Sequence, residues 1–174
     1  MAADTQQRAA RVRLMLFDVD GTLTDGTLYI GEGGELMKAF NVRDGHGLKM
    51  LQESGVEVGL LSSRRSRMVE SRAAELGIRL VVQGVSDKAA ALGELIAQRA
   101  LRPEQCGYMG DDLPDLAVMS MCGFSASVPD APEAVRARAH YVSAAPGGRG
   151  AAREVCELIL VAQGRLKQAA RPLP

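Results

Sequence analysis

Four groups of polar residues stand beside short apolar runs or patterned segments, and together they suit the transfer of a phosphoryl group. Asp18 and Asp20 come directly after the first run. Ser62 follows a second, Asp111 follows another, and Lys88 opens a patterned segment. A carboxylate that attacks phosphorus approaches an anion, and like charges ~4 Å apart repel by on the order of 4 kcal/mol at an intermediate dielectric constant. The reaction therefore needs a hard divalent cation, a fixed ammonium and a hydroxyl donor, which these residue types supply or bind.

The order of these residues assigns a role to each. Asp18 is the expected nucleophile that forms an aspartyl-phosphate. Asp20 is expected to protonate the leaving oxygen and later to deprotonate the attacking water. Ser62 and Lys88 are expected to bind the phosphoryl oxygens. The expected cofactor is Mg²⁺, held by Asp18, Asp20 and Asp111, since Mg²⁺ takes few protein carboxylates besides water and phosphate oxygens.

Simpler roles are possible for the same residues. An EF-hand calcium loop requires Gly at position 6 and Glu at position 12; counted from Asp18, these positions hold Leu23 and Tyr29. A plain turn with two solvated acids remains an alternative. Ser62 alone could cap a following helix, and Lys88 alone could be an exposed lysine at a helix start.

Two acids beyond Asp111 receive different interpretations. Asp115 is interpreted as an acid in the first turn of a helix, where it favours the helix dipole. Asp112 is instead expected to position Lys88 or the metal's water.

Apolar runs alternate with helix-period segments along the chain. The expected strands are 12–17, 56–61, 79–82, 106–109, 123–126 and 141–142, and the expected helices are 45–54, 66–76, 87–99, 113–121 and 151–162. This alternation predicts an α/β fold with a doubly wound parallel sheet. Residues that follow its strands meet at one edge. The segment 27–40, with the Gly-rich stretch 31–34 at its centre, predicts a β-hairpin inserted after the first strand.

The spacing also predicts the domain organisation. We expect residues 1–12 to be a disordered leader, 13–166 to be a single domain and 167–174 to be a loose tail. The expected helices, strands and hairpin account for the residues between Asp18 and Ser62 and between Ser62 and Asp111. Neither interval is therefore long enough for a separate cap domain. An enzyme without its own lid gains from a neighbouring subunit that excludes water, and the hairpin has edges that such a subunit could pair. The sequence therefore favours a homo-oligomer.

Composition argues against several classes of protein. The 174 residues include 21 Lys+Arg and 21 Asp+Glu, and 47% are apolar, as in ordinary globular chains. Zero net charge argues against general binding to nucleic acid or to a membrane surface. No apolar run approaches the ~20 residues that span a bilayer, and the first residues lack a secretory signal's apolar core. Three cysteines without C-x-x-C spacing suit reduced thiols in the cytoplasm.

Four segments match, in order, the motifs of a known superfamily. They are Phe17-Asp18-Val19-Asp20-Gly21-Thr22-Leu23-Thr24-Asp25-Gly26, Leu60-Leu61-Ser62-Ser63-Arg64, Asp87-Lys88 and Gly110-Asp111-Asp112-Leu113-Pro114-Asp115. Taken together they are highly specific, and the chain resembles the phosphatases of the haloacid dehalogenase superfamily. The resemblance implies a Rossmann-like sheet of the haloacid dehalogenase type.

Residues 38–47 and 146–155 narrow the resemblance to the 3-deoxy-D-manno-octulosonate 8-phosphate phosphatase family, over about residues 14–166. It implies a Mg²⁺-dependent homotetramer that hydrolyses an eight-carbon 2-keto-3-deoxy sugar acid phosphate for lipopolysaccharide synthesis. A mobile segment around Arg149 would reach a neighbour's active site. The substrate-binding residues that it implies are Asp20, Asn41, Val42, Arg43, Asp44, Gly45, Lys49, Arg64, Arg72, Lys88 and Arg149.

Two alternative functions remain open at this point. A nine-carbon sialic- or KDN-type acid 9-phosphate would keep the chemistry and change the substrate. A phospho-aspartate signalling or binding module would keep the acids without turnover. Receiver domains place the phosphorylated Asp after their third strand, and here that strand is followed by Gln83-Gly84, which argues against a receiver.

Overall fold

The computed structural model describes residues 3–169 and contains a six-stranded sheet in the order β5-β4-β1-β6-β7-β8, paired in parallel throughout. Its strands are β1 Leu14–Phe17, β4 Glu57–Ser62, β5 Leu80–Gln83, β6 Cys106–Met109, β7 Phe124–Ser127 and β8 Tyr141–Val142. The predicted doubly wound α/β fold is confirmed. Every residue of β1 and of β6 is buried, as expected for central strands covered on both faces.

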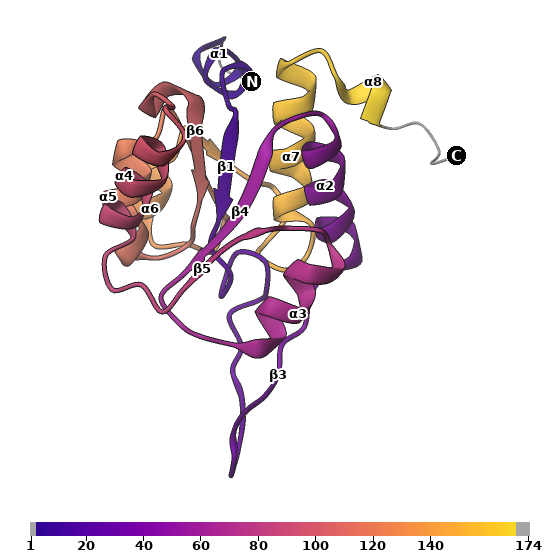
Figure 1. Cartoon of the computed structure of the whole chain (residues 1–174), viewed down its shortest axis with the longest axis vertical. Helices are drawn as coiled ribbons and strands as arrows, with labels where there is room; N and C mark the ends of the chain where they lie inside the picture. Colours follow the sequence, from indigo (N-terminus) through magenta and orange to yellow (C-terminus); the bar gives the residue numbers. More distant parts are fainter. Residues whose placement is uncertain (1–2, 170–174) are drawn as a thin grey trace.

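Helices cover both faces of this sheet (Figure 1). One layer holds α2 Val42–Glu53, α3 Arg67–Glu75 and α7 Ala151–Ala162, and the other holds α4 Lys88–Gln98, α5 Leu116–Met121 and α6 Glu133–Arg138. Short 3-10 turns η1 Pro103–Gln105 and η2 Leu113–Asp115 precede β6 and α5. The chain from β1 to β4 forms only a hairpin and α2, so no separate cap domain covers the sheet. Among residues 3–169 we find no helix long and apolar enough to cross a membrane.

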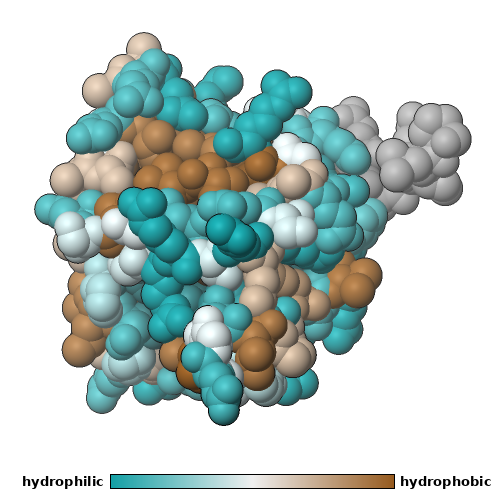
Figure 2. Space-filling model, turned by 60° about the horizontal axis from the view of Figure 1, so that its bottom comes forward, coloured by the Kyte–Doolittle hydropathy of each residue, from teal (hydrophilic) through white to brown (hydrophobic). Residues whose placement is uncertain are grey.

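The inserted hairpin consists of β2 Tyr29–Gly31 and β3 Gly34–Met37, paired antiparallel as a separate two-stranded sheet. It projects from the end of the molecule at which β1 and β4 finish (Figure 1). Several of its large apolar side chains are exposed: Leu28, Tyr29, Ile30, Leu36 and Met37. Figure 2 brings this end of the molecule toward the viewer and shows apolar residues as brown patches between hydrophilic ones.

Parts of the expected leader and of the expected tail form helices. Residues 3–10 of the expected leader form helix α1, Ala3–Ala10. Its Ala9 is fully buried and its Thr5 hydroxyl donates to the carbonyl of His140 at 3.0 Å, so contacts with the domain hold the helix in place. The expected tail begins inside α8, Leu166–Ala169, and its last five residues lie outside the described part of the chain.

Candidate active site

Three neighbouring strands bring the predicted catalytic residues to one edge of the sheet. Phe17, the last residue of β1, is level with Leu60 of β4 on one side and Met109 of β6 on the other. Asp18, Ser62 and Asp111 follow these positions closely, and the backbone N–H of Asp18 donates to the carbonyl of Met109 at 2.9 Å. Parallel strands thus gather residues that are distant in sequence at their carboxyl ends, as the sequence predicts.

Lys88 joins this group from the other helix layer. It is the first residue of α4, whose N-cap Asp87 accepts from the backbone N–H of Ala90. Its Nζ lies 2.9 Å from Oδ1 of Asp18 and 2.7 Å from Oδ1 of Asp115, and it donates to the Tyr108 hydroxyl at 3.1 Å. The side chain is only 6% exposed. Burial works to lower the pKa of Lys88, but the carboxylates of Asp18 and Asp115 outweigh it and raise that pKa. Lys88 is therefore a fixed cation beside Asp18, the predicted nucleophile.

Asp115 lies in the first turn of η2, as the sequence predicts, but it is also a buried anchor, which the sequence interpretation did not include. Its Oδ1 accepts from Lys88 and, at 2.6 Å, from the Tyr108 hydroxyl. Its Oδ2 accepts from the backbone N–H groups of Asp111 and Asp112 at 3.0 and 3.1 Å. Asp112, which the sequence predicts to position Lys88, is exposed and instead accepts from the N–H of Leu113 as the N-cap of η2.

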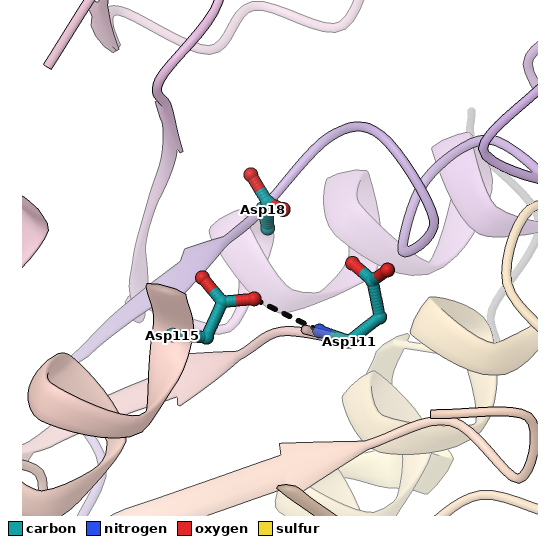
Figure 3. Close-up of side chains that lie close together, drawn as sticks. All are labelled: Asp18, Asp111 and Asp115. Carbon is teal, nitrogen blue, oxygen red and sulfur yellow. Dashed lines mark hydrogen bonds between the residues drawn. The ribbon is translucent and has the colours of Figure 1, made fainter. Parts of the chain in front are cut away.

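The carboxylates of Asp18, Asp111 and Asp115 converge from the loops after β1 and β6 and from the turn that follows (Figure 3). Their nearest oxygens all lie within 4.8 Å of one another. Burial, opposed by Lys88, raises the pKa of Asp18 to about 6. Burial and then the charges of Asp18 and Asp115 raise the pKa of Asp111 to about 7. The site thus carries more negative charge than its own cation balances.

This donor set fits a hard divalent cation, which prefers oxygen ligands. Both oxygens of Asp115 are already engaged by protein donors. Asp18 and Asp111 are therefore the residues that would hold the metal, while Asp115 holds Lys88 and the Asp111 backbone. We refer to Asp18, Lys88, Tyr108, Asp111 and Asp115 as the strand-end cluster.

The loop after Asp18 fits closely against Asp111. Thr22 donates from its hydroxyl to Oδ1 of Asp111 at 3.2 Å. Gly21 has a φ of +89°, and a Cβ there would lie 1.9 Å from an oxygen of Asp111. Only glycine allows this loop to bring the two acids together.

Asp20 lies apart from the acidic cluster, although the sequence places it among the metal ligands. Its Oδ1 accepts from the ammonium of Lys38, and its Oδ2 lies 3.5 Å from Nε of Arg64. The side chain thus faces the hairpin and the loop after β4, and the structure does not bring its carboxylate to Asp18 and Asp111. This position leaves the carboxyl of Asp20 outside the acidic cluster, which is compatible with the predicted acid/base role.

Ser62 ends β4 and is 3% exposed. Its Oγ accepts from the backbone N–H of Arg64 at 3.3 Å, so its hydroxyl hydrogen can still be donated to a phosphoryl oxygen. The N-cap of the following helix α3 is Ser66. Ser62 is therefore not the helix cap that its sequence position also allows.

The 41–45 segment divides into exposed and buried residues. Asn41 is the N-cap of α2 and accepts from the N–H of Arg43, while Val42 and Arg43 are exposed. Asp44 is 2% exposed, and its two oxygens accept from the backbone N–H groups of Gly150 and Arg153 at 3.1 and 2.8 Å. The expected substrate residue Asp44 is thus committed to the start of α7, because unpaired amides at a helix N-terminus favour a carboxylate.

The expected substrate-binding cations occupy different environments. Arg64 is 45% exposed and lies next to Asp20. Arg72 lies against Gly45 and binds Glu75 at 2.7 Å. A hollow of about 380 Å³ lies beside Lys38, and its other lining residues are Phe40, Arg67, Met68, Ser71, Arg72 and Glu75. Lys49 is exposed on α2.

Arg149 is 69% exposed and lies 3.9 Å from Asp25. The segment that carries it packs against the loop after Asp18 of the same chain. The N–H of Gly148 donates to the carbonyl of Thr22 at 2.9 Å, and a Cβ on Gly147 would lie 1.8 Å from the carbonyl of Gly21. Gly147 and Gly148 therefore allow this segment to pack closely against the loop after Asp18 in the same chain.

Sequence reasoning assigned no role to Tyr108, Glu35 or Lys38, which the structure places at the site. Tyr108 is a polar residue inside an otherwise buried strand, and that signal could have identified it. Glu35 and Lys38 are three residues apart on the hairpin, and only the folded position of the hairpin brings them to Asp20. We refer to Asp20, Glu35, Lys38, Arg64 and Ser66 as the hairpin network.

Comparisons with known proteins agree with this geometry. A family model described as haloacid dehalogenase-like hydrolase matches residues 81–154. The 3-deoxy-D-manno-octulosonate 8-phosphate phosphatase of Yersinia pestis is 49% identical, over 97% of this chain and 90% of that protein. The enzyme of that name from Escherichia coli K12 is 46% identical over the same shares.

Solved structures give the same result. The Moraxella catarrhalis 3-deoxy-D-manno-octulosonate 8-phosphate phosphatase, in complex with magnesium ion, phosphate ion and KDO, has a TM-score of 0.94 and 42% identity, covering 97% of each chain. The cobalt-bound Haemophilus influenzae phosphatase has a TM-score of 0.91 and 40% identity, covering 95% of this chain and 96% of that one. The chain therefore belongs to the 3-deoxy-D-manno-octulosonate 8-phosphate phosphatase family of haloacid dehalogenase-like hydrolases.

Proposed function

We propose that this protein is a Mg²⁺-dependent phosphomonoesterase that hydrolyses 3-deoxy-D-manno-octulosonate 8-phosphate to the free sugar acid and phosphate. One observation carries the chemistry: Lys88 bridges Asp18 and Asp115 beside an Asp18–Asp111 pair that lacks balancing charge. The substrate follows from the names of relatives at 46–49% identity over 97% of the chain. The same resemblance places the reaction in lipopolysaccharide synthesis.

In the first half of the reaction, an oxygen of Asp18 attacks phosphorus and the bond to the sugar oxygen breaks. Lys88 and the Ser62 hydroxyl bind the phosphoryl oxygens and offset the negative charge as the two anions approach. Asp20 gives its proton to the departing sugar oxygen. Mg²⁺ bound between Asp18 and Asp111 would supply the remaining positive charge.

In the second half, water attacks the phosphorus of phosphoryl-Asp18. Asp20, now a carboxylate, takes the proton from this water, and phosphate and the Asp18 carboxylate are released. Lys88 stays in place throughout, because Asp115 and Tyr108 hold its ammonium in a buried position. The chain's own residues thus perform both proton transfers.

The carboxylate of the sugar acid lies at the opposite end of the eight-carbon chain from the phosphate, so it requires a cationic surface some distance from Asp18. The hollow next to Lys38 has Arg67 and Arg72 in its lining, and Arg64 contacts Asp20 from the same loop region. An arginine guanidinium can bind a carboxylate through two parallel hydrogen bonds. We assign this hollow to the sugar acid end of the substrate, and the family resemblance adds Asn41, Arg43 and Lys49 as further substrate-binding residues.

Assembly is the second part of the proposal. The exposed apolar side chains of the hairpin favour a homo-oligomer, and the family resemblance favours a tetramer. Unpaired hairpin edges and apolar patches are commonly covered by another copy. In the assembly Arg149 would approach the active site of an adjacent subunit. Light scattering on the purified protein checks the mass, and a monomer with full activity would contradict this part.

We also propose that the protein acts in the cytoplasm. Cys106, Cys122 and Cys156 are all free and buried. Burial raises the pKa of Cys106 to about 11 and also raises the pKa of each of the other two thiols. Such unreactive thiols need no oxidising compartment. Fractionation of cells that express the full-length chain tests the location.

A phosphate-release screen tests the function. The substrates are the eight-carbon acid 8-phosphate, a nine-carbon sialic- or KDN-type acid 9-phosphate and common hexose phosphates, each with Mg²⁺ or with a chelator. We expect the highest kcat/KM for the eight-carbon acid, no turnover with the chelator and none with Asp18→Asn. A higher kcat/KM for the nine-carbon acid 9-phosphate would show that it, and not the eight-carbon acid phosphate, is the preferred substrate. Turnover that survives chelation would contradict the mechanism.

A further inference from the structure

Lys38 is a buried cation outside the strand-end cluster. It follows β3 directly, and its side chain is only 2% exposed. Its ammonium donates to Oδ1 of Asp20 and lies 2.9 Å from Oε1 of Glu35. Taking an ammonium out of water is costly unless carboxylates compensate it, so the contacts with Asp20 and Glu35 account for its burial.

Glu35 connects this lysine to the loop after β4. Its Oε2 accepts from the Ser66 hydroxyl at 2.7 Å, and its Oε1 lies 3.4 Å from a guanidinium nitrogen of Arg64. Burial opposes it, but the hydrogen bonds from Ser66 and Lys38 lower the pKa of Glu35. Glu35 thus binds Lys38 together with Asp20 and connects the hairpin to the loop after β4.

The two oxygens of Asp20 are bound unequally. Lys38 contacts Oδ1 with a buried ammonium, whereas Arg64 reaches Oδ2 only at 3.5 Å with a side chain that is 45% exposed. A hydrogen bond at the first oxygen fixes the rotation of the carboxyl. The second oxygen is then free to exchange a proton with the leaving group or with water.

We propose that Lys38, held by Glu35, is a positioning residue that orients Asp20 so that Oδ2 carries the transferred proton. Lys38 borders the hollow assigned to the sugar acid, but its ammonium is buried against the carboxylates of Asp20 and Glu35, so the role assigned to it is exerted through Asp20. This inference rests on the proposed function, since it concerns the proton donor of that reaction. It gives the hairpin a part in catalysis within its own subunit.

The test compares a sugar phosphate with an activated aryl phosphate, whose leaving oxygen needs little protonation. Lys38→Met removes the cation and keeps most of the side chain's length. We expect kcat on the sugar phosphate to fall by about 10- to 100-fold, which is a part of the rate acceleration that a positioned general acid supplies. KM should stay close to wild type, and kcat on the aryl phosphate should fall much less. Lys38→Arg, which restores a cation, should recover most of the rate.

Two controls exclude a merely structural effect. Lys167→Met makes the same change at an exposed lysine of α8 and should leave kcat on both substrates unchanged. Light scattering should give the same mass for Lys38→Met and the wild type. If Lys38→Met slows both substrates equally, or if its main effect is a higher KM for the sugar phosphate, Lys38 is a structural or substrate-binding residue and the inference fails.

A double-mutant comparison decides whether Lys38 acts through Asp20. In the Asp20→Asn background, adding Lys38→Met should cause little further loss, because residues in one hydrogen-bonded unit are not additive. A full additional loss in that background would overturn the inference. A wild type that releases no phosphate from either ester would contradict the proposed function itself, which keeps the two failures distinct.

Discussion

The strand-end cluster and the hairpin network differ in how they are held. Lys88 and Asp115 of the cluster are 6% and 1% exposed, and both bind the hydroxyl of Tyr108 in the central strand β6. Arg64 of the network is 45% exposed, and the network depends on a hairpin that projects from the domain. In the proposed mechanism, bond-making at phosphorus uses the more buried region, whereas proton transfer uses the region built on the projecting hairpin.

The largest expected effect is in the more buried region. Asp18→Asn removes the nucleophile and keeps its shape, so turnover should fall by at least about a thousandfold, on the order of 4 kcal/mol of barrier. Circular dichroism should show an unchanged fold, because the carboxylate that is lost is a buried charge with a pKa raised by burial. Phosphate release within tenfold of wild type would remove Asp18 from the nucleophile role.

Asp115→Asn tests the anchor of Lys88. An amide nitrogen cannot accept from the two backbone N–H groups that Oδ2 now binds, and the ion pair with Lys88 is lost. Breaking a buried pair in this way should lower the free energy of unfolding by about 3 kcal/mol and reduce kcat as well. Urea unfolding gives the first value and phosphate release the second.

Asp112→Asn is the matched control for Asp115→Asn. Asn caps a helical turn about as well as Asp, and Asp112 is exposed. The free energy of unfolding of the Asp112→Asn variant should therefore stay close to that of the wild type. Equal losses for the two variants would show that Asp115 is no more of an anchor than its neighbour.

The stability of the metal-free protein should fall as pH rises. The folded-state pKa values of Asp18 and Asp111 are raised to about 6 and about 7, above the ordinary value of 3.8. The folded state therefore binds more protons than the unfolded state between pH ~4 and pH ~7, and the free energy of unfolding decreases through that range by a few kcal/mol in total.

Urea unfolding at several pH values, with a chelator or with Mg²⁺, measures this effect. Mg²⁺ should remove most of the decrease, because it favours the ionised carboxylates of the folded state. Asp111→Asn should flatten the metal-free profile. A profile that rises with pH in this range would contradict the assigned electrostatics.

The smallest expected effect is at Arg149, which lies outside both regions. Arg149→Ala should leave the oligomer intact and lower kcat/KM on the sugar phosphate by roughly 1–3 kcal/mol, the range for a lost charge-assisted hydrogen bond. Light scattering and steady-state kinetics check the two parts. Unchanged kinetics would make Arg149 an ordinary exposed residue.

The difference between the regions also explains what the sequence could predict. Asp18, Ser62 and Asp111 follow apolar strands, and the rule that parallel strand ends share an edge is enough to bring them together. The periodicity predicts β6, β8 and α7 at their observed bounds. The site residues closest to the core were therefore the easiest to find.

Residues whose roles depend on tertiary contacts escaped prediction. Asp115 has the sequence position of a dipole partner, and only its burial against Tyr108 and Lys88 reveals the anchor. Asp44 reaches α7 from 106 residues away in sequence. The helix α6 and the helix α1 at the N-terminus are short, and their packing against the domain outweighs their weak sequence signals.

Trapping the covalent intermediate tests the central claim most directly. Asp20→Asn should slow hydrolysis of phosphoryl-Asp18 more than its formation from an activated aryl phosphate, so the phosphoenzyme should accumulate after rapid quenching in acid. Mass spectrometry should then find one added phosphoryl group, located at Asp18 and absent from the Asp18→Asn/Asp20→Asn double variant. Wild-type phosphate release with no phosphoryl group on the quenched Asp20→Asn protein, or with that group on another residue, would contradict the account.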